Sequence, residues 1–183
     1  MADQSVGPWH AHIREIRSKE RGRHDPRTGR VYTTAATREY EALIKTTCRI
    51  ARGRAAMVEG WCVVGVFILD LIPTSWRTKR GEPTLQARRA AWQREPARAS
   101  EDVDNVIKAA LDGANGAWYR GDAKVLPVPW RGWTADPARA GLHLVLWPAA
   151  TPAAAFHVVA GDDSQWATMV LRLSRPPADW MAP

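Results

Sequence analysis

WCVVGVFILDLI, residues 61–72, is the stretch of sequence that decides the fold. It is rich in β-branched and aromatic residues, which are favoured in strands. Its apolar residues fall on both faces of a strand, whereas a strand with one face in water would alternate apolar and polar residues. We therefore expect a central strand that ends at Pro73 and is covered on both faces.

Two segments that flank this strand in the sequence have the spacing of amphipathic helices. Residues 37–54 carry apolar side chains at i, i+3, i+4 and i+7, with Thr37 as the expected N-cap. Residues 104–114 have the same spacing, with Asp104 as the expected N-cap and an Asn-Gly helix stop at 115–116. We expect an α/β (α+β) fold in which a small mixed sheet packs with two main helices.

The remaining segments give weaker signals. A pair of strands is expected near residues 123–128 and 141–147, joined by a loop that contains proline and glycine. A short helix is expected near residues 84–94. The tract PAATPAAA, residues 148–155, is typical of a linker.

Composition favours one globular domain with tails. The chain has 183 residues, of which 45% are hydrophobic and 25% charged, which is ordinary for a globular protein. Three parts are expected: residues 1–20, which lack a clear opening strand; the main domain at 20–147; and a C-terminal extension of unknown role at 148–183.

The charge of the chain is concentrated in its first half. The formal net charge is +7, and residues 1–100 carry 19 Lys and Arg against 10 Asp and Glu, whereas residues 101–183 carry 7 against 9. A basic excess of this size suits a surface that binds a polyanion, because each neutralised phosphate releases condensed counterions. The alternative is that these side chains only keep the surface solvated.

Cysteine content and hydropathy bear on the location of the protein. Cys48 and Cys62 are too few and too far apart in sequence for a disulfide framework or a zinc site by themselves. No apolar run follows Met1, so a signal peptide is not indicated. The longest apolar stretch is too short to span a bilayer. We expect a cytoplasmic protein with no membrane partner and no small-molecule cofactor.

The segment after the central strand mixes aromatic and basic side chains. Trp76 and Trp92 alternate there with several arginines and lysines. This mixture suits contact with a DNA backbone and exposed bases. For each tryptophan alone, the alternative that it pins a loop to the core is equally consistent with the sequence.

The chemistry is expected around the second helix. Asp104, Lys108 and Asp112 are spaced by four residues, so one helical face presents a carboxylate, an ammonium group and a carboxylate. Asp102 precedes them, and a returning strand could bring Asp122 beside the helix start. Converging carboxylates suit Mg²⁺, which prefers oxygen ligands and assists phosphodiester cleavage. Taken singly, each aspartate is more often an N-cap or an ion-pair partner.

The run from Asp102 to Val125 closely resembles the signature of the RusA family of Holliday junction resolvases. The shared features are Asp-x-Asp-Asn, a lysine four residues after the second aspartate, a helix that ends near Asn-Gly, and an aspartate before the next strand. Residues 21–41 resemble the basic N-terminal loop of that family, and residues 73–80 resemble its Pro-x-Ser-Trp loop. The similarity covers roughly residues 20–147.

The resemblance implies a set of site residues and partners. It places the metal-binding aspartates at Asp102, Asp104 and Asp122, the catalytic lysine at Lys108, and supporting roles at Asp112 and Asn105. It implies Mg²⁺ as the cofactor, with Mn²⁺ as a substitute, four-way or other branched DNA as the substrate, and a homodimer. The candidates for contacts to the DNA backbone are Arg21, Arg23, Arg77, Lys79 and Arg80.

One position departs from the family pattern. Gly121 stands where the family has the first aspartate of an Asp-Asp pair. From the resemblance we expect a structure-specific endonuclease that resolves Holliday junctions. Because of this departure, the alternative is a non-catalytic branched-DNA-binding protein of the same fold. An interaction or assembly protein is a third class, which would better explain the Ala- and Pro-rich tail.

Overall fold

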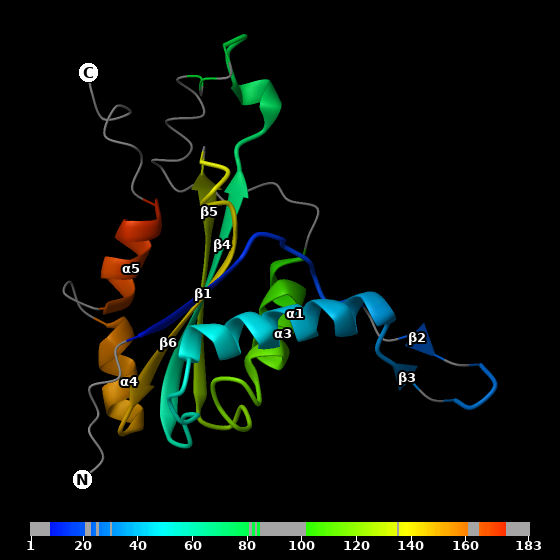
Figure 1. Cartoon of the computed structure of the whole chain (residues 1–183), viewed down its shortest axis with the longest axis vertical. Helices are drawn as coiled ribbons and strands as arrows, with labels where there is room; N and C mark the ends of the chain where they lie inside the picture. The colour runs from blue at the N-terminus through cyan, green and yellow to red at the C-terminus, as the bar shows by residue number, and fades with distance from the viewer. Residues whose placement is uncertain are drawn as a thin grey trace.

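A computed structural model of the chain describes residues 8–20, 23–24, 26–29, 31–80, 82, 84, 102–134, 136–160 and 165–174. Its centre is a four-stranded mixed sheet of order β1-β6-β4-β5, with helices on both faces (Figure 1). The sheet strands are β1 (Trp9–Ile13), β4 (Trp61–Leu71), β5 (Val125–Thr134) and β6 (Gly141–Ala149). The helices are α1 (Ala35–Arg52), α3 (Val103–Ala114), α4 (Pro152–Val159), α5 (Gln165–Ser174) and the 3₁₀ turn η1 (Thr74–Trp76). The expected α+β class with a small mixed sheet is confirmed.

The central strand is β4, as the sequence predicted. It pairs parallel with β5 on one side and antiparallel with β6 on the other. Residues 62–69 of this strand are all buried, because helices cover both faces of the sheet. The expectation that β5 and β6 pair with each other is wrong, since β4 lies between them. A parallel β4–β5 pair requires a crossover connection, and α3 lies within it.

Helices α1 and α3 cover one face of the sheet and pack closely on each other (Figure 1). At their contact Gly113 faces Ile44, and a Cβ atom added to Gly113 would lie 2.6 Å from Ile44 Cβ. No side chain fits at this distance, so the glycine allows the two helices to approach. The approach fixes the position of α3 relative to α1.

The opposite face is covered by α4 and α5 (Figure 1). Their buried side chains, which include Met169 and Val170, join Phe67 and Trp147 of the sheet in a second core cluster. The prediction of a linker at residues 148–155 is therefore wrong. Thr151 caps α4 by accepting a hydrogen bond from the Ala154 backbone N–H, so the Ala- and Pro-rich tract starts a helix.

The start of the chain also differs from the expectation. Residues 9–13 form an edge strand that pairs with β6, and the side chains of Trp9, Ala11 and Ile13 on one face of this strand are buried. The alternation of these residues with His10 and His12 is the period of a half-buried strand, but five residues gave a weak signal.

Both main helices begin slightly earlier than predicted. Thr34 caps α1 in place of Thr37, and Asp102 caps α3 in place of Asp104. The expected short helix at residues 84–94 lies almost wholly outside the described residues. Within the described part of the chain, no helix combines the length and apolarity needed to cross a membrane.

A small two-stranded ribbon, β2 (Arg23–His24) with β3 (Val31–Tyr32), forms within the basic segment that precedes α1. The ribbon projects from the start of α1, away from the sheet (Figure 1).

Candidate active site

The N-terminus of α3 holds the first two predicted aspartates. Asp102 caps the helix: its Oδ1 accepts a hydrogen bond from the Asp104 backbone N–H at 3.2 Å, and its Oδ2 accepts one from Asn105 Nδ2 at 3.0 Å. The unpaired N–H groups at a helix start favour negative charge there. Asn105 thus fixes the orientation of the Asp102 carboxylate, which gives a physical basis for the predicted supporting role.

Lys108 lies one turn further along the same helix. Its Nζ is 2.5 Å from Asp104 Oδ2, and the side chains of Lys108 and Asp104 are 57% and 68% exposed. An ion pair this exposed contributes little to stability. Both groups therefore remain accessible to a bound phosphate or cation, which is the arrangement that the sequence predicted for this end of the helix.

Asp112 is paired with a residue that sequence reasoning missed. Its Oδ2 accepts a hydrogen bond from Lys19 Nζ, and the same Nζ lies 3.2 Å from Glu41 Oε1. The hydrogen bond that Lys19 donates to Asp112 is the main cause that raises the pKa of Lys19. Spacing could not reveal this pair, because Lys19 and Asp112 lie 93 residues apart in the chain.

Asp122 lies at the other end of α3. Asp102 and Asn115 cap the two ends of this 12-residue helix, so the length of the helix, roughly 20 Å from cap to cap, separates them. Asn115 Oδ1 accepts a hydrogen bond from the Gly121 backbone N–H at 3.1 Å, which holds the residue before Asp122 at the C-terminal end. In Figure 1 the chain after α3 turns at the bottom of the view and enters β5 there.

The single chain therefore does not bring its three predicted metal ligands together. Among the described residues, which include Asp102, Asp104 and Asp122, no three carboxylate, histidine or cysteine side chains form a group that could hold a metal ion. The returning strand runs back along the sheet, but it starts from the wrong end of the helix to carry Asp122 to the helix start. The roles of these aspartates stay predictions.

Gly121, the position of the departure from the family pattern, has a left-handed backbone with φ of 76°. A Cβ atom at this position would meet no atom within 4 Å. Space therefore does not exclude a side chain here, whereas the backbone conformation favours glycine.

The predicted DNA contacts are spread over two regions. Arg77, Lys79 and Arg80 follow η1, and the last two are exposed. Arg23 starts β2, while Arg21 lies outside the described residues. These positions stay predictions.

The two tryptophans of the basic segment have different outcomes. Trp76 packs on the buried Trp133 with ring centroids 5.4 Å apart, so it anchors its loop to the domain. Trp92 lies outside the described residues.

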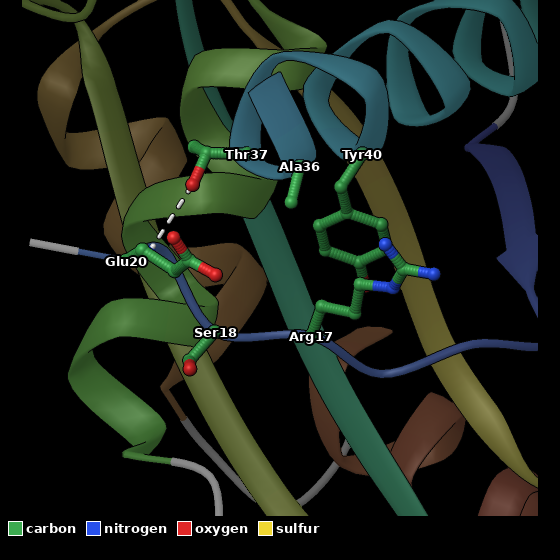
Figure 2. A pocket seen from close by; sticks show the side chains of 6 residues that line it. All are labelled: Arg17, Ser18, Glu20, Ala36, Thr37 and Tyr40. Atoms are coloured by element: carbon green, nitrogen blue, oxygen red, sulfur yellow. Dashed lines mark hydrogen bonds between the residues drawn. The ribbon is translucent and has the colours of Figure 1, made fainter. Parts of the chain in front are cut away.

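A shallow hollow lies between the segment that carries Lys19 and the first turns of α1. Figure 2 shows the side chains that line it. In it the Glu20 backbone N–H donates a hydrogen bond to Thr37 Oγ1 at 3.2 Å. The hollow is lined by Arg17, Ser18, Glu20, Ala36, Thr37 and Tyr40. Because none of these is a predicted catalytic residue, we take the contact to be an anchor of the segment on α1.

A basic α+β domain that exposes two aspartates and a lysine at one helix start has the groups of a metal-assisted phosphodiester-cleaving enzyme. The chain belongs to the RusA family: the family model for Endodeoxyribonuclease RusA matches residues 15–143. None of the curated protein sequences matches the chain significantly. The RusA family is a family of DNA endonucleases, so membership in it indicates a nuclease. The match includes all of α3 and ends within β6, so α4 and α5 lie outside it.

Proposed function

We propose that this protein is a Mg²⁺-dependent endonuclease that resolves four-way DNA junctions by paired symmetric nicks. The observation that carries the proposal is the position of Asp102, Asp104 and Lys108 on one exposed helix end within the matched family region. Family membership supports the nuclease class, and the site supports the chemistry.

The residues at the helix start fit a magnesium ion held partly by substrate. Mg²⁺ commonly takes one or two protein carboxylates and completes its shell with waters and phosphate oxygens. Asp102 and Asp104 would supply the two carboxylates. The ion would activate water and stabilise charge at the attacked phosphate, and Mn²⁺ could replace it. Lys108, adjacent to Asp104, would neutralise the negative charge that develops on the phosphate.

A homodimer follows from the symmetry of the substrate. A four-way junction is approximately two-fold symmetric and must be cut on two strands, and a C₂ dimer supplies two sites in that relationship. Within one chain Asp122 is separated from Asp102 and Asp104 by the length of α3. We therefore propose that Asp122 of a second copy completes each site.

The alternative is a branched-DNA-binding protein of the same fold that does not cleave. Gly121 favours this alternative, because it removes a carboxylate that the family pattern has beside Asp122. A protein of this kind would keep the basic surface and would not need Asp104.

The test is cleavage of a synthetic four-way junction and of its matched linear duplex in Mg²⁺, with the wild type beside Asp104→Asn. Paired nicks in the junction alone, absent with the variant, are expected. Junction binding by the wild type without cleavage would reject the nuclease in favour of the alternative.

The basic residues of the two loops would bind the junction through its phosphates. The logarithm of the binding constant should then fall with the logarithm of salt concentration, with a slope of about −0.9 per contacted phosphate. An affinity that does not change with salt would contradict these contacts.

A further inference from the structure

Lys108 lies between two competing carboxylates on α3. Asp104 is one turn before it and Asp112 one turn after it, and a lysine side chain can reach either neighbour at this spacing. In the structure the Lys108 Nζ lies 2.5 Å from Asp104 Oδ2, whereas Asp112 is bound by Lys19. Sequence spacing alone therefore does not decide which of the two carboxylates Lys108 contacts.

Lys19 is held firmly where the two helices meet. Its backbone N–H donates to the Asn105 carbonyl oxygen at 3.1 Å, which ties the segment to the first turn of α3. The next residue, Glu20, donates through its backbone N–H to Thr37 on α1 (Figure 2). The backbone is thus fixed to both helices on either side of the lysine.

The side chain of Lys19 is also more enclosed than the ion pair of Lys108 with Asp104. It is 30% exposed and Glu41 is 23% exposed, compared with 57% for Lys108 and 68% for Asp104. Ordering a partly enclosed lysine costs less additional entropy than ordering an exposed one, because its surroundings already restrict it. Lys19 is therefore the better fixed of the two lysines.

We propose that Lys19 is a positioning residue: by holding Asp112, it keeps the Lys108 ammonium group at Asp104, where the phosphate would be attacked. The consequence for cleavage rests on the proposed function. Without Lys19, Asp112 becomes a free competitor one turn away. Exposed ion pairs differ little in free energy, so Lys108 would divide its time between the two carboxylates.

The experiment is a set of mutant cycles on the full-length protein, with the single-turnover rate of junction cleavage as the readout. Lys19→Met lowers the rate about two- to fivefold, the range expected when two weak exposed pairs compete. In the background of Asp112→Asn, where no competitor remains, Lys19→Met leaves the rate unchanged. Lys19→Arg, which can still bind Asp112, keeps the wild-type rate.

Glu41→Gln supplies the matched control. It removes the same charge from the other carboxylate that Lys19 contacts, but Glu41 lies on α1 whereas Lys108 and Asp112 lie on α3. In this background Lys19→Met still lowers the rate as in the wild type. If Lys19→Met lowers the cleavage rate equally in all backgrounds, Lys19 acts as a general electrostatic or DNA contact. If both Asp112→Asn and Glu41→Gln restore the rate of Lys19→Met, Lys19 acts only through the net charge of this region. Either result overturns the proposal.

A second readout does not depend on activity. Crystal structures of Lys19→Met, alone and with Asp112→Asn, show which carboxylate Lys108 contacts; the expected partner includes Asp112 in the single variant and is Asp104 in the double variant. Lys108 bound only to Asp104 in both would overturn the proposal. If the wild type cleaves no junction, the proposed function fails, and these structures still decide the role of Lys19.

Discussion

The side-chain amide of Asn105 donates a hydrogen bond to Asp102 Oδ2 at 3.0 Å, while Asp102 Oδ1 caps α3. The same carboxylate therefore has a structural role and a proposed metal-binding role, and two substitutions separate them. Asp102→Ala removes both and should lower the free energy of unfolding by about 1 kcal/mol, the usual value of an N-cap. Asp102→Asn keeps an N-cap oxygen and should leave stability nearly unchanged.

Both variants should lose junction cleavage, because neither keeps the carboxylate at position 102 that is proposed to bind Mg²⁺. Urea unfolding measures the stability, and a junction assay measures the activity. Full activity of Asp102→Asn would show that this residue acts only as a cap.

Lys108 should matter for catalysis and hardly for folding. Its exposed i, i+4 pair with Asp104 is worth about 0.3 to 0.5 kcal/mol. Loss of a group that stabilises transition-state charge typically costs about 10²- to 10³-fold in rate. Lys108→Gln should therefore lower the cleavage rate by roughly this factor with an unchanged melting temperature and nearly unchanged junction binding. A loss of binding equal to the loss of rate would instead make Lys108 a simple backbone contact.

The sequence predicted the parts of the fold that depend on local pattern. The apolar run at residues 61–72 and the helical spacing of α1 and α3 are properties of neighbouring residues, and both are confirmed. The partner of a strand is a property of distant residues. That is why β5 and β6 were expected to pair with each other, although β4 separates them.

The site was predictable to the same extent. Asp102, Asp104 and Lys108 share one helix end, and helical geometry alone places them together. The strand after α3 predicts that Asp122 lies beside them. However, this strand starts near the C-terminus of α3, so Asp122 lies at the opposite end of the helix. Lys19 approaches Asp112 only through the packing of the N-terminal segment on two helices, which no spacing encodes.

The separation of Asp122 from the start of α3 predicts complementation between subunits. Consider a mixed dimer of one Asp104→Asn chain and one Asp122→Asn chain. If each site takes Asp104 from one chain and Asp122 from the other, both substitutions fall in the same site and the second site is intact. The mixture should therefore nick one strand of the junction, although each variant alone is inactive.

Nicked and resolved products, separated on denaturing gels after refolding the two chains together, measure this. Two tags of different size purify the mixed dimer, and a mixture of wild type with Asp104→Asn serves as the control. A mixed dimer with no nicking would place Asp122 in the site of its own chain.

His143 stacks with His10 and His12, and from this group we predict how the free energy of unfolding depends on pH. The pKa of His143 is lowered to about 4, chiefly by burial and to a smaller extent by the nearby His12 and His10, while the hydrogen bond to the Arg139 backbone partly opposes the shift. His143 Nε2 lies 2.8 Å from the Arg139 carbonyl oxygen, which needs a donor, and its Nδ1 lies 3.1 Å from His10 Nε2. A neutral His143 can satisfy both contacts, whereas a protonated ring would present a second N–H to His10.

The unfolded chain takes up this proton at its ordinary pKa near 6.5, and the folded chain only near 4. Between these values the unfolded state binds more protons, so stability is full above pH 6.5 and falls as the pH is lowered toward 4. The loss from His143 should be on the order of 2 to 3 kcal/mol. Urea unfolding at pH 7.5 and 4.5 measures it, with His143→Gln as the comparison. The variant should lose less stability than the wild type over this range, and an equal loss in both would show that groups other than His143 cause the acid sensitivity.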